Sequence, residues 1–112
     1  MAMPWWLPFG RVPGIAPEAL KHELGARPPP QLLDVRSPGE FEHDHIDGAV
    51  NVPITELQGR LPSLALDKSR PVIAICLSAH RSVPAVRLLA RAGYSDVRQL
   101  EGGMLAYRRL RA

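Results

Sequence analysis

The hydrophobic positions of this 112-residue chain fall into short apolar runs that alternate with stretches of helical spacing. Short apolar runs are typical of strands, and amphipathic stretches between them are typical of crossover helices. The runs predict strands at residues 11–15, 31–35, 49–52, 70–75 and 97–100. Helices are predicted at residues 17–24, 54–61, 82–92 and 104–111, with a short one that begins near Ser37. This alternation predicts an α/β fold, in which crossover helices cover a sheet.

The pattern is clearest for the strand at 70–75 and the helix at 82–92. The strand is apolar almost throughout, as expected for a central parallel strand that is covered on both faces. Gly93 marks the end of the helix, and four residues share its apolar face: Val83, Val86, Leu89 and Ala90. The short helix has its own start signal, because Ser37 can cap it and Glu40 follows three residues later.

Composition places the chain among ordinary globular domains. Its length predicts one domain, its 46% hydrophobic content suffices for a compact core, and its net charge of +3 is too small to imply disorder. We find no apolar run long enough to span a bilayer and no good signal peptide. One cysteine allows no internal disulfide, so we predict a cytoplasmic protein that binds neither membranes nor nucleic acid.

The two ends of the chain differ from its middle. Residues 1–10 are predicted to be an apolar arm before a domain at 11–112, and the arm holds three of the six aromatic side chains. We expect the arm to pack along the domain surface, with a partner-binding or dimer-forming arm as the alternative. At the other end, Arg108, Arg109 and Arg111 form a basic cluster. We interpret this cluster as the solvated end of a helix, with contact to an acidic partner as the alternative.

The only cysteine, Cys76, directly follows the clearest strand and precedes a short loop and the clearest helix. A loop bent around a sulfur can point backbone N–H groups at it, and the positive end of the following helix adds to their effect. Such a setting favours a thiolate. A small buried hydrophobic side chain is the alternative role for a lone cysteine. The order of strand, cysteine, loop and helix favours a nucleophile.

The loop after Cys76 has the spacing C-x-x-x-x-R, which ends at Arg81. A guanidinium there adds fixed positive charge, and its planar fork suits an oxyanion. Ser78 and Ser82 can donate hydroxyl hydrogen bonds to the same site. His80 can supply a proton or a charge near neutral pH, although an exposed loop imidazole is an equally good interpretation.

Other kinds of site have little support. The His43-Asp44-His45 segment has metal-binding side chains, but without a second cluster it is a weak zinc signal. The chain has no glycine-rich loop of the nucleotide-binding type. We therefore predict no metal site.

Three stretches together carry a resemblance to single-domain, rhodanese-like sulfurtransferases. The first is L-D-V-R-S-P-G-E-F at residues 33–41, which continues as H-I-D-G-A-V-N-V-P at 45–53. The second is the loop C-L-S-A-H-R-S at 76–82, and the third is L-E-G-G-M-L-A-Y at 100–107. Each alone is a weak signal, but the order and spacing of the three resemble this family over roughly residues 15–110.

The resemblance implies a three-layer fold, with a central five-stranded parallel sheet and helices on both faces. It also implies that Cys76 takes a sulfane sulfur from a donor such as thiosulfate, becomes a persulfide, and gives the outer sulfur to a thiophilic acceptor. The substrate-binding loop would comprise Leu77, Ser78, Ala79, His80, Arg81 and Ser82. The donor and acceptor would be small molecules or proteins, and no cofactor is implied.

Residues outside the loop are expected to support it. Arg36 and Glu40 lie four residues apart, so an ion pair between them can fix the first stretch. Asp34, at the end of a strand, is implied by the resemblance to lie near the site in a supporting role. The chain departs from the family pattern at Ala79, where glycine is frequent, at Asp44, also often glycine, and at Tyr107, often tryptophan.

Three alternative functions stay open. Phosphatases of the cell-cycle type share this fold, but their C-x-x-x-x-x-R loop is one residue longer and accommodates a phosphate. A persulfide carrier would relay sulfur between proteins with little small-molecule turnover. A protein-interaction module is the third alternative, although domains of that kind often lack the cysteine that this chain keeps.

Overall fold

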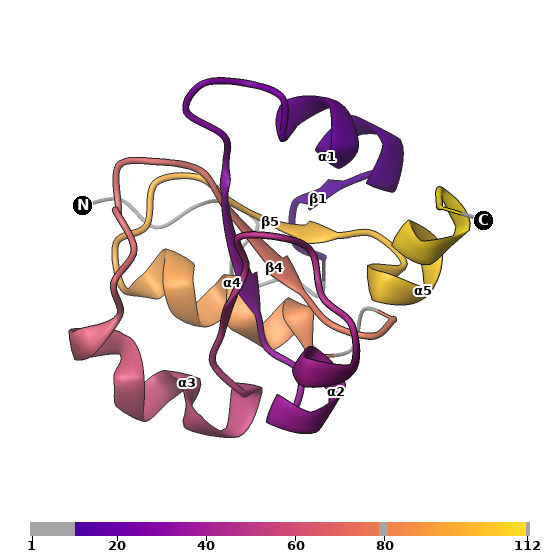
Figure 1. Cartoon of the computed structure of the whole chain (residues 1–112). Helices are drawn as coiled ribbons and strands as arrows, with labels where there is room; N and C mark the ends of the chain where they lie inside the picture. Colours follow the sequence, from indigo (N-terminus) through magenta and orange to yellow (C-terminus); the bar gives the residue numbers. More distant parts are fainter. Residues whose placement is uncertain (1–10, 79–80, 112) are drawn as a thin grey trace.

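The computed structural model describes residues 11–78 and 81–111, so the apolar arm at 1–10 lies outside the described residues. Parallel strands form one sheet in the order β1-β5-β4-β2-β3 (Figure 1). The strands are β1 (Gly14–Ile15), β2 (Gln31–Asp34), β3 (Val50–Asn51), β4 (Val72–Ile75) and β5 (Val97–Leu100). The predicted α/β class and its five-stranded parallel sheet are confirmed.

Helices cover both faces of this sheet and make three layers (Figure 1). One face packs against α1 (Pro17–Glu23) and α5 (Gly103–Arg109), and the other against α3 (Ile54–Arg60) and α4 (Ser82–Arg91). The short helix α2 (Pro38–His43) follows β2 at the carboxyl edge of the sheet. None of the helices among the described residues is long and apolar enough to cross a membrane.

Strand β4 lies at the centre of both cores, and all four of its residues are fully buried. Ile73 and Ile75 point into the core beneath α1 and α5, with Leu20 and Met104. Val72 and Ala74 point to the other face, where they pack with side chains of α3 and α4. Because side chains alternate along a strand, Cys76 falls on the α3–α4 side. The prediction of a central strand covered on both faces is confirmed.

The boundaries differ from the prediction mainly at the sheet edges. The strands β1 and β3 have two residues each, where five and four were predicted. Within the described part of the chain, each of them pairs with one neighbour, so fewer ladder hydrogen bonds hold residues in the extended conformation. The helix predicted at 54–61 ends at Arg60, because Leu61–Ser63 tightens into a 3-10 turn around a proline.

The predicted cap of α2 is confirmed. The backbone N–H of Glu40 donates to the hydroxyl of Ser37 at 3.3 Å, and the N–H of Ser37 donates to the carboxylate of Glu40 at 3.0 Å. This reciprocal pair satisfies two backbone donors at the helix start. It also fixes the Glu40 side chain on the side of α2 where it can contact the loop after β4.

Candidate active site at Cys76

The Cys76 side chain lies directly after β4 and is buried, with 1% of its surface exposed. Its thiol donates to the hydroxyl oxygen of Ser82 at 3.5 Å, and that hydroxyl donates to the side-chain carbonyl of Gln99 at 2.7 Å. Ser82 is the first residue of α4, and Gln99 belongs to β5. The predicted pairing of Cys76 with Ser82 is therefore present. Gln99 was missed, because a glutamine in a strand carries no sequence signal for a site.

The first half of the loop is held by α5. The backbone N–H groups of Met104 and Leu105 donate to the carbonyls of Cys76 and Leu77 at 2.9 and 3.0 Å. The N–H of a trans peptide points opposite to its carbonyl, so the N–H groups of Leu77 and Ser78 point away from α5. The loop therefore has donors to offer on the side that α5 does not occupy.

This close approach depends on Gly103. Its φ of 59° lies in the left-handed region, and a Cβ there would come within 2.5 Å of the carbonyl oxygens of both Cys76 and Leu77. Only glycine allows the helix start to lie against the loop backbone. The sequence showed the Gly102-Gly103 pair, but its contact with Cys76 could not be read from it.

Arg81 ends the loop and forms a bidentate ion pair with Glu40 of α2. Its two terminal nitrogens donate to the two carboxylate oxygens at 2.6 and 2.9 Å. This hydrogen bonding is the largest effect on the pKa of Glu40, which is lowered to about 2. The pKa of Arg81 is raised, chiefly by Glu40 and to a smaller extent by negative charge at Cys76 and Asp34.

The predicted ion pair between Arg36 and Glu40 is wrong. Spacing of four residues brings side chains together only within a helix, and Ser37 between them is in an extended conformation. Arg36 instead forms a buried pair with Asp34, in which its terminal nitrogen lies 2.8 Å from one carboxylate oxygen and its Nε lies 3.0 Å from the other. Both side chains are almost fully buried.

The buried pair is part of a larger network at the carboxyl end of β2. Arg36 also donates to the backbone carbonyl of Asp44 at 2.6 Å. Asn51 donates to the carbonyls of both Asp34 and Arg36 at 2.9 Å. Asp34 pairs in register with Ile75, the residue before the cysteine. The network therefore fixes the backbone beside the candidate nucleophile.

The other predicted site residues have different outcomes. Ala79 and His80 lie outside the described residues, whereas Leu77 and Ser78 are partly buried beside Cys76. Leu77 lines a small cavity of about 410 Å³ together with Gly39 and Glu40 of α2, Arg36, His43 and Arg108. Leu77 directly follows the candidate nucleophile, although Cys76 itself is not among the residues that line this cavity.

The basic cluster at the end of the chain is partly charge-balanced. Arg108 and Arg111 bind the carboxylate of Asp44 at 3.0 and 2.7 Å, which lowers the pKa of Asp44 to about 2, with Arg111 as the largest cause. His45, beside it, stacks on Phe41 and is hydrogen bonded to the carbonyl of that residue at 2.6 Å. Asp44, which departs from the family pattern, therefore anchors α5 to the connection between α2 and β3.

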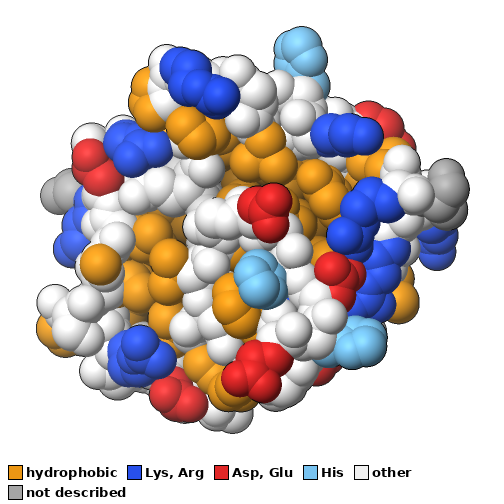
Figure 2. Space-filling view, viewed as in Figure 1, with side chains coloured by type: hydrophobic (Ala, Val, Ile, Leu, Met, Phe, Trp, Pro, Cys, Tyr) orange, Lys and Arg blue, Asp and Glu red, His pale blue; other side chains and the backbone are white. Residues whose placement is uncertain are grey.

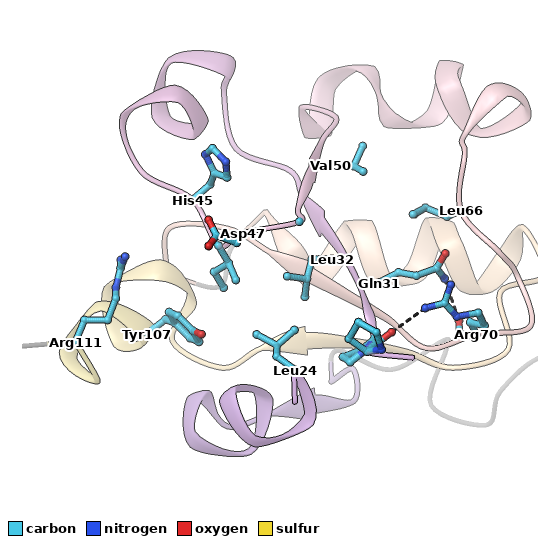
Figure 3. A pocket seen from close by; sticks show the side chains of 14 residues that line it. Leu24, Gln31, Leu32, His45, Asp47, Val50, Leu66, Arg70, Tyr107 and Arg111 are labelled. Carbon is cyan, nitrogen blue, oxygen red and sulfur yellow. Dashed lines mark hydrogen bonds between the residues drawn. The ribbon is translucent and has the colours of Figure 1, made fainter. Parts of the chain in front are cut away.

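A larger cavity of about 600 Å³ lies elsewhere, between α1, α5 and the β2–β3 edge (Figure 3). Figure 2 shows hydrophobic side chains lining a hollow on this face, with Lys and Arg side chains around it. Its apolar lining includes Leu24, Leu32, Ile46, Val50, Leu66 and Tyr107. None of the described residues between 76 and 82 lines it. The size of a cavity alone would therefore not identify Cys76 as the candidate site.

Comparisons with known proteins agree with this geometry. A family model described as "Rhodanese-like domain" matches residues 16–110. The uncharacterized protein YqhL of Bacillus subtilis is 41% identical over 73 residues, which cover 65% of this chain and 56% of that protein. The thiosulfate sulfurtransferase GlpE of Pseudomonas syringae is 33% identical over 100 residues, which cover 89% of this chain and 88% of that protein.

Solved structures show the same fold. A rhodanese-related protein from Thermoplasma volcanium superimposes with a TM-score of 0.78 at 27% identity, and the match covers 88% of this chain and 93% of that one. Some curated relatives are much longer, since the matched region spans only 56%, 34% and 24% of the length of three of them.

Proposed function

This chain belongs to the rhodanese-like domain family, and on that premise we propose that it is a sulfurtransferase that carries sulfur as a persulfide on Cys76. The family includes thiosulfate sulfurtransferases at 31% and 33% identity to this chain. The observation that supports the proposal most directly is the position of Cys76. It lies at the junction of β4 and a C-x-x-x-x-R loop, with the loop backbone anchored on α5.

The reaction has two displacement steps. In the first, the Cys76 thiolate attacks the sulfane sulfur of a donor such as thiosulfate, the S–S bond of the donor breaks, and sulfite leaves with the bonding electrons. In the second, a thiophilic acceptor such as cyanide attacks the outer sulfur of the persulfide. Thiocyanate leaves, and the Cys76 thiolate is regenerated. Each step conserves charge, so no external oxidant or reductant is required.

Each part of the site has a role in this scheme. The N–H groups of Leu77 and Ser78, which point away from α5, supply hydrogen bonds for negative charge in the loop. The hydroxyl of Ser82, 3.5 Å from Sγ, can turn to donate to the thiolate once the thiol proton is lost. Asp34 and Arg36 hold the strand end beside Cys76 and take no part in bond making. No cofactor enters these steps.

The length of the loop argues against a phosphatase. A tetrahedral phosphate with its oxygens needs more donors around it than a single sulfur. The four residues between Cys76 and Arg81 form a smaller ring than the five of the related phosphatases. We therefore propose sulfur, and not phosphate, as the transferred group.

Intact-protein mass spectrometry tests the proposal. Wild type and Cys76→Ser are incubated with thiosulfate or, in a second sample, with a protein persulfide, and then with cyanide. We expect wild type alone to gain the mass of one sulfur and to lose it with cyanide. Absence of any sulfur adduct with both donors, or release of phosphate from an aryl phosphate, would overturn the proposal.

A further inference from the structure

Ion pairs surround the opening of the cavity beside Leu77, which we call the mouth of the candidate site. Arg81 binds Glu40, Arg36 binds Asp34, and Arg108 shares Asp44 with Arg111. Among the residues that the structure describes, each guanidinium that borders the cavity beside Leu77, or that ends the loop, has a carboxylate partner. A site built to collect a small dianion would instead direct an unpaired cation at it.

Of these ion pairs, Arg81–Glu40 is the one that ends the loop after Cys76. Arg81 directly precedes Ser82, whose hydroxyl lies 3.5 Å from Sγ of Cys76, and negative charge at Cys76 contributes to the raised pKa of Arg81. Each terminal nitrogen already donates one N–H to Glu40, so an incoming oxyanion meets a guanidinium whose charge is balanced by a carboxylate. The Glu40 carboxylate also accepts two hydrogen bonds from Ser37 in the cap of α2, so moving it away from Arg81 would break both.

We propose that Glu40 is a positioning residue that also sets donor specificity: by holding and neutralising Arg81, it favours organic sulfane-sulfur donors with one negative charge over the dianion thiosulfate. These donors are thiosulfonates and the persulfides of small thiols or proteins, and the single negative charge is that of the sulfane-sulfur group. This inference rests on the proposed function, because it concerns the donor that loads Cys76. Thiosulfate remains a substrate, but a poorer one than a monoanion of similar reactivity.

The two loading reactions have the same form. The thiolate attacks the terminal sulfur of a thiosulfonate, the S–S bond breaks, and a sulfinate leaves, just as sulfite leaves from thiosulfate. The donors differ in charge at the moment when they enter the mouth beside Glu40. Removal of one negative charge there is expected to favour a monoanion about threefold and a dianion roughly tenfold, because the Coulomb energy doubles and the factor is squared.

Glu40→Gln tests this difference with little change in structure. Glutamine keeps the capping interaction with Ser37 and still offers one oxygen to Arg81. Asp96→Asn is the matched control, since it removes one charge from an exposed side chain just before β5, at the opposite end of the strands from Cys76. Loading rates of Cys76 are measured by mass spectrometry with thiosulfate and with benzenethiosulfonate at low ionic strength.

We expect Glu40→Gln to raise kcat/KM roughly tenfold for thiosulfate and about threefold for benzenethiosulfonate, and Asp96→Asn to change neither. High salt should shrink both gains. Equal losses with both donors would mean that Glu40 is only structural, and an unchanged ratio between the donors would also overturn the inference. If neither donor loads wild type, the proposed function fails and this inference falls with it.

A second measurement is independent of sulfur transfer. Cys76 is alkylated with iodoacetate, an anion, and with iodoacetamide, its neutral analogue. If Glu40 controls the charge of the mouth, Glu40→Gln raises the ratio of the two rates about threefold, and Asp96→Asn leaves it unchanged. A ratio that is the same in wild type and Glu40→Gln would contradict the inference even in a protein that loads sulfur well.

Discussion

Replacement of Gly103 by alanine should damage both the fold and the candidate site, because one backbone position serves both. Two separate effects are expected. A φ of 59° is unfavourable for alanine by about 1 kcal/mol. In addition, the new Cβ would lie 2.5 Å from two carbonyl oxygens, so α5 and the loop must separate. The two hydrogen bonds that Met104 and Leu105 donate to the loop would then weaken, each at about 1 kcal/mol.

Three glycines allow these effects to be measured one at a time. Gly59, inside α3, has open space where a Cβ would lie and no positive φ, so alanine there should stabilise the protein by about 0.5–1 kcal/mol. Gly48 also has open space but a φ of 88°, so alanine there should cost about 1 kcal/mol from backbone strain alone. Gly103→Ala should cost about 3 kcal/mol or more, because strain and separation add.

Urea unfolding of the three variants gives the free energies, and mass spectrometry gives the rate of sulfur loading at Cys76. We expect loading to fall only in Gly103→Ala, because only that change moves the loop carbonyls. A loss of stability in Gly103→Ala no larger than that in Gly48→Ala would refute the role of the close approach. Sulfur loading at the wild-type rate by folded Gly103→Ala would refute the link between α5 and the loop.

Two further predictions concern ion pairs. Asp34→Asn should lower the free energy of unfolding by about 3–5 kcal/mol in urea titrations, because it leaves the Arg36 charge buried without its partner; a loss as small as that of Asp96→Asn would contradict this. Asp44 has a folded-state pKa of about 2, below its usual 3.8, so its pairing stabilises the fold above pH 3.8 and is lost as the pH falls toward 2. The melting temperature of wild type should therefore fall further than that of Asp44→Asn between about pH 5 and about pH 2.5. Equal decreases in the two melting temperatures would contradict the assignment of this pKa to Asp44.

Local signals in the sequence predicted local structure well. The capping pattern at Ser37 predicted the start of α2, and the apolar run before Cys76 predicted a strand that is buried on both faces. Both signals depend on residues that lie within a few positions of each other along the chain. The short edge strands were overestimated, because their length depends on how many neighbours a strand has, and the apolar pattern does not contain that number.

The partners in ion pairs could not be predicted in the same way. Arg36 and Glu40 were paired because of their spacing, but the true partners are Asp34 for the first and Arg81, 41 residues along the chain, for the second. The choice depends on the extended backbone at Ser37 and on the packing of α2 against the loop. The sequence does not indicate a role for Gln99 for a related reason, since its contact with Ser82 exists only once β5 lies beside β4.

The contacts of the loop after Cys76 give a physical reason why three separated stretches of this chain act together. Glu40 from the first stretch binds Arg81 at the end of the loop, and Met104 and Leu105 from the third bind the carbonyls at its start. The loop is thus held at both ends by segments that contribute no reacting atom. A substitution in either outer stretch should therefore alter sulfur chemistry without contact to the donor, through the position or the charge of the loop.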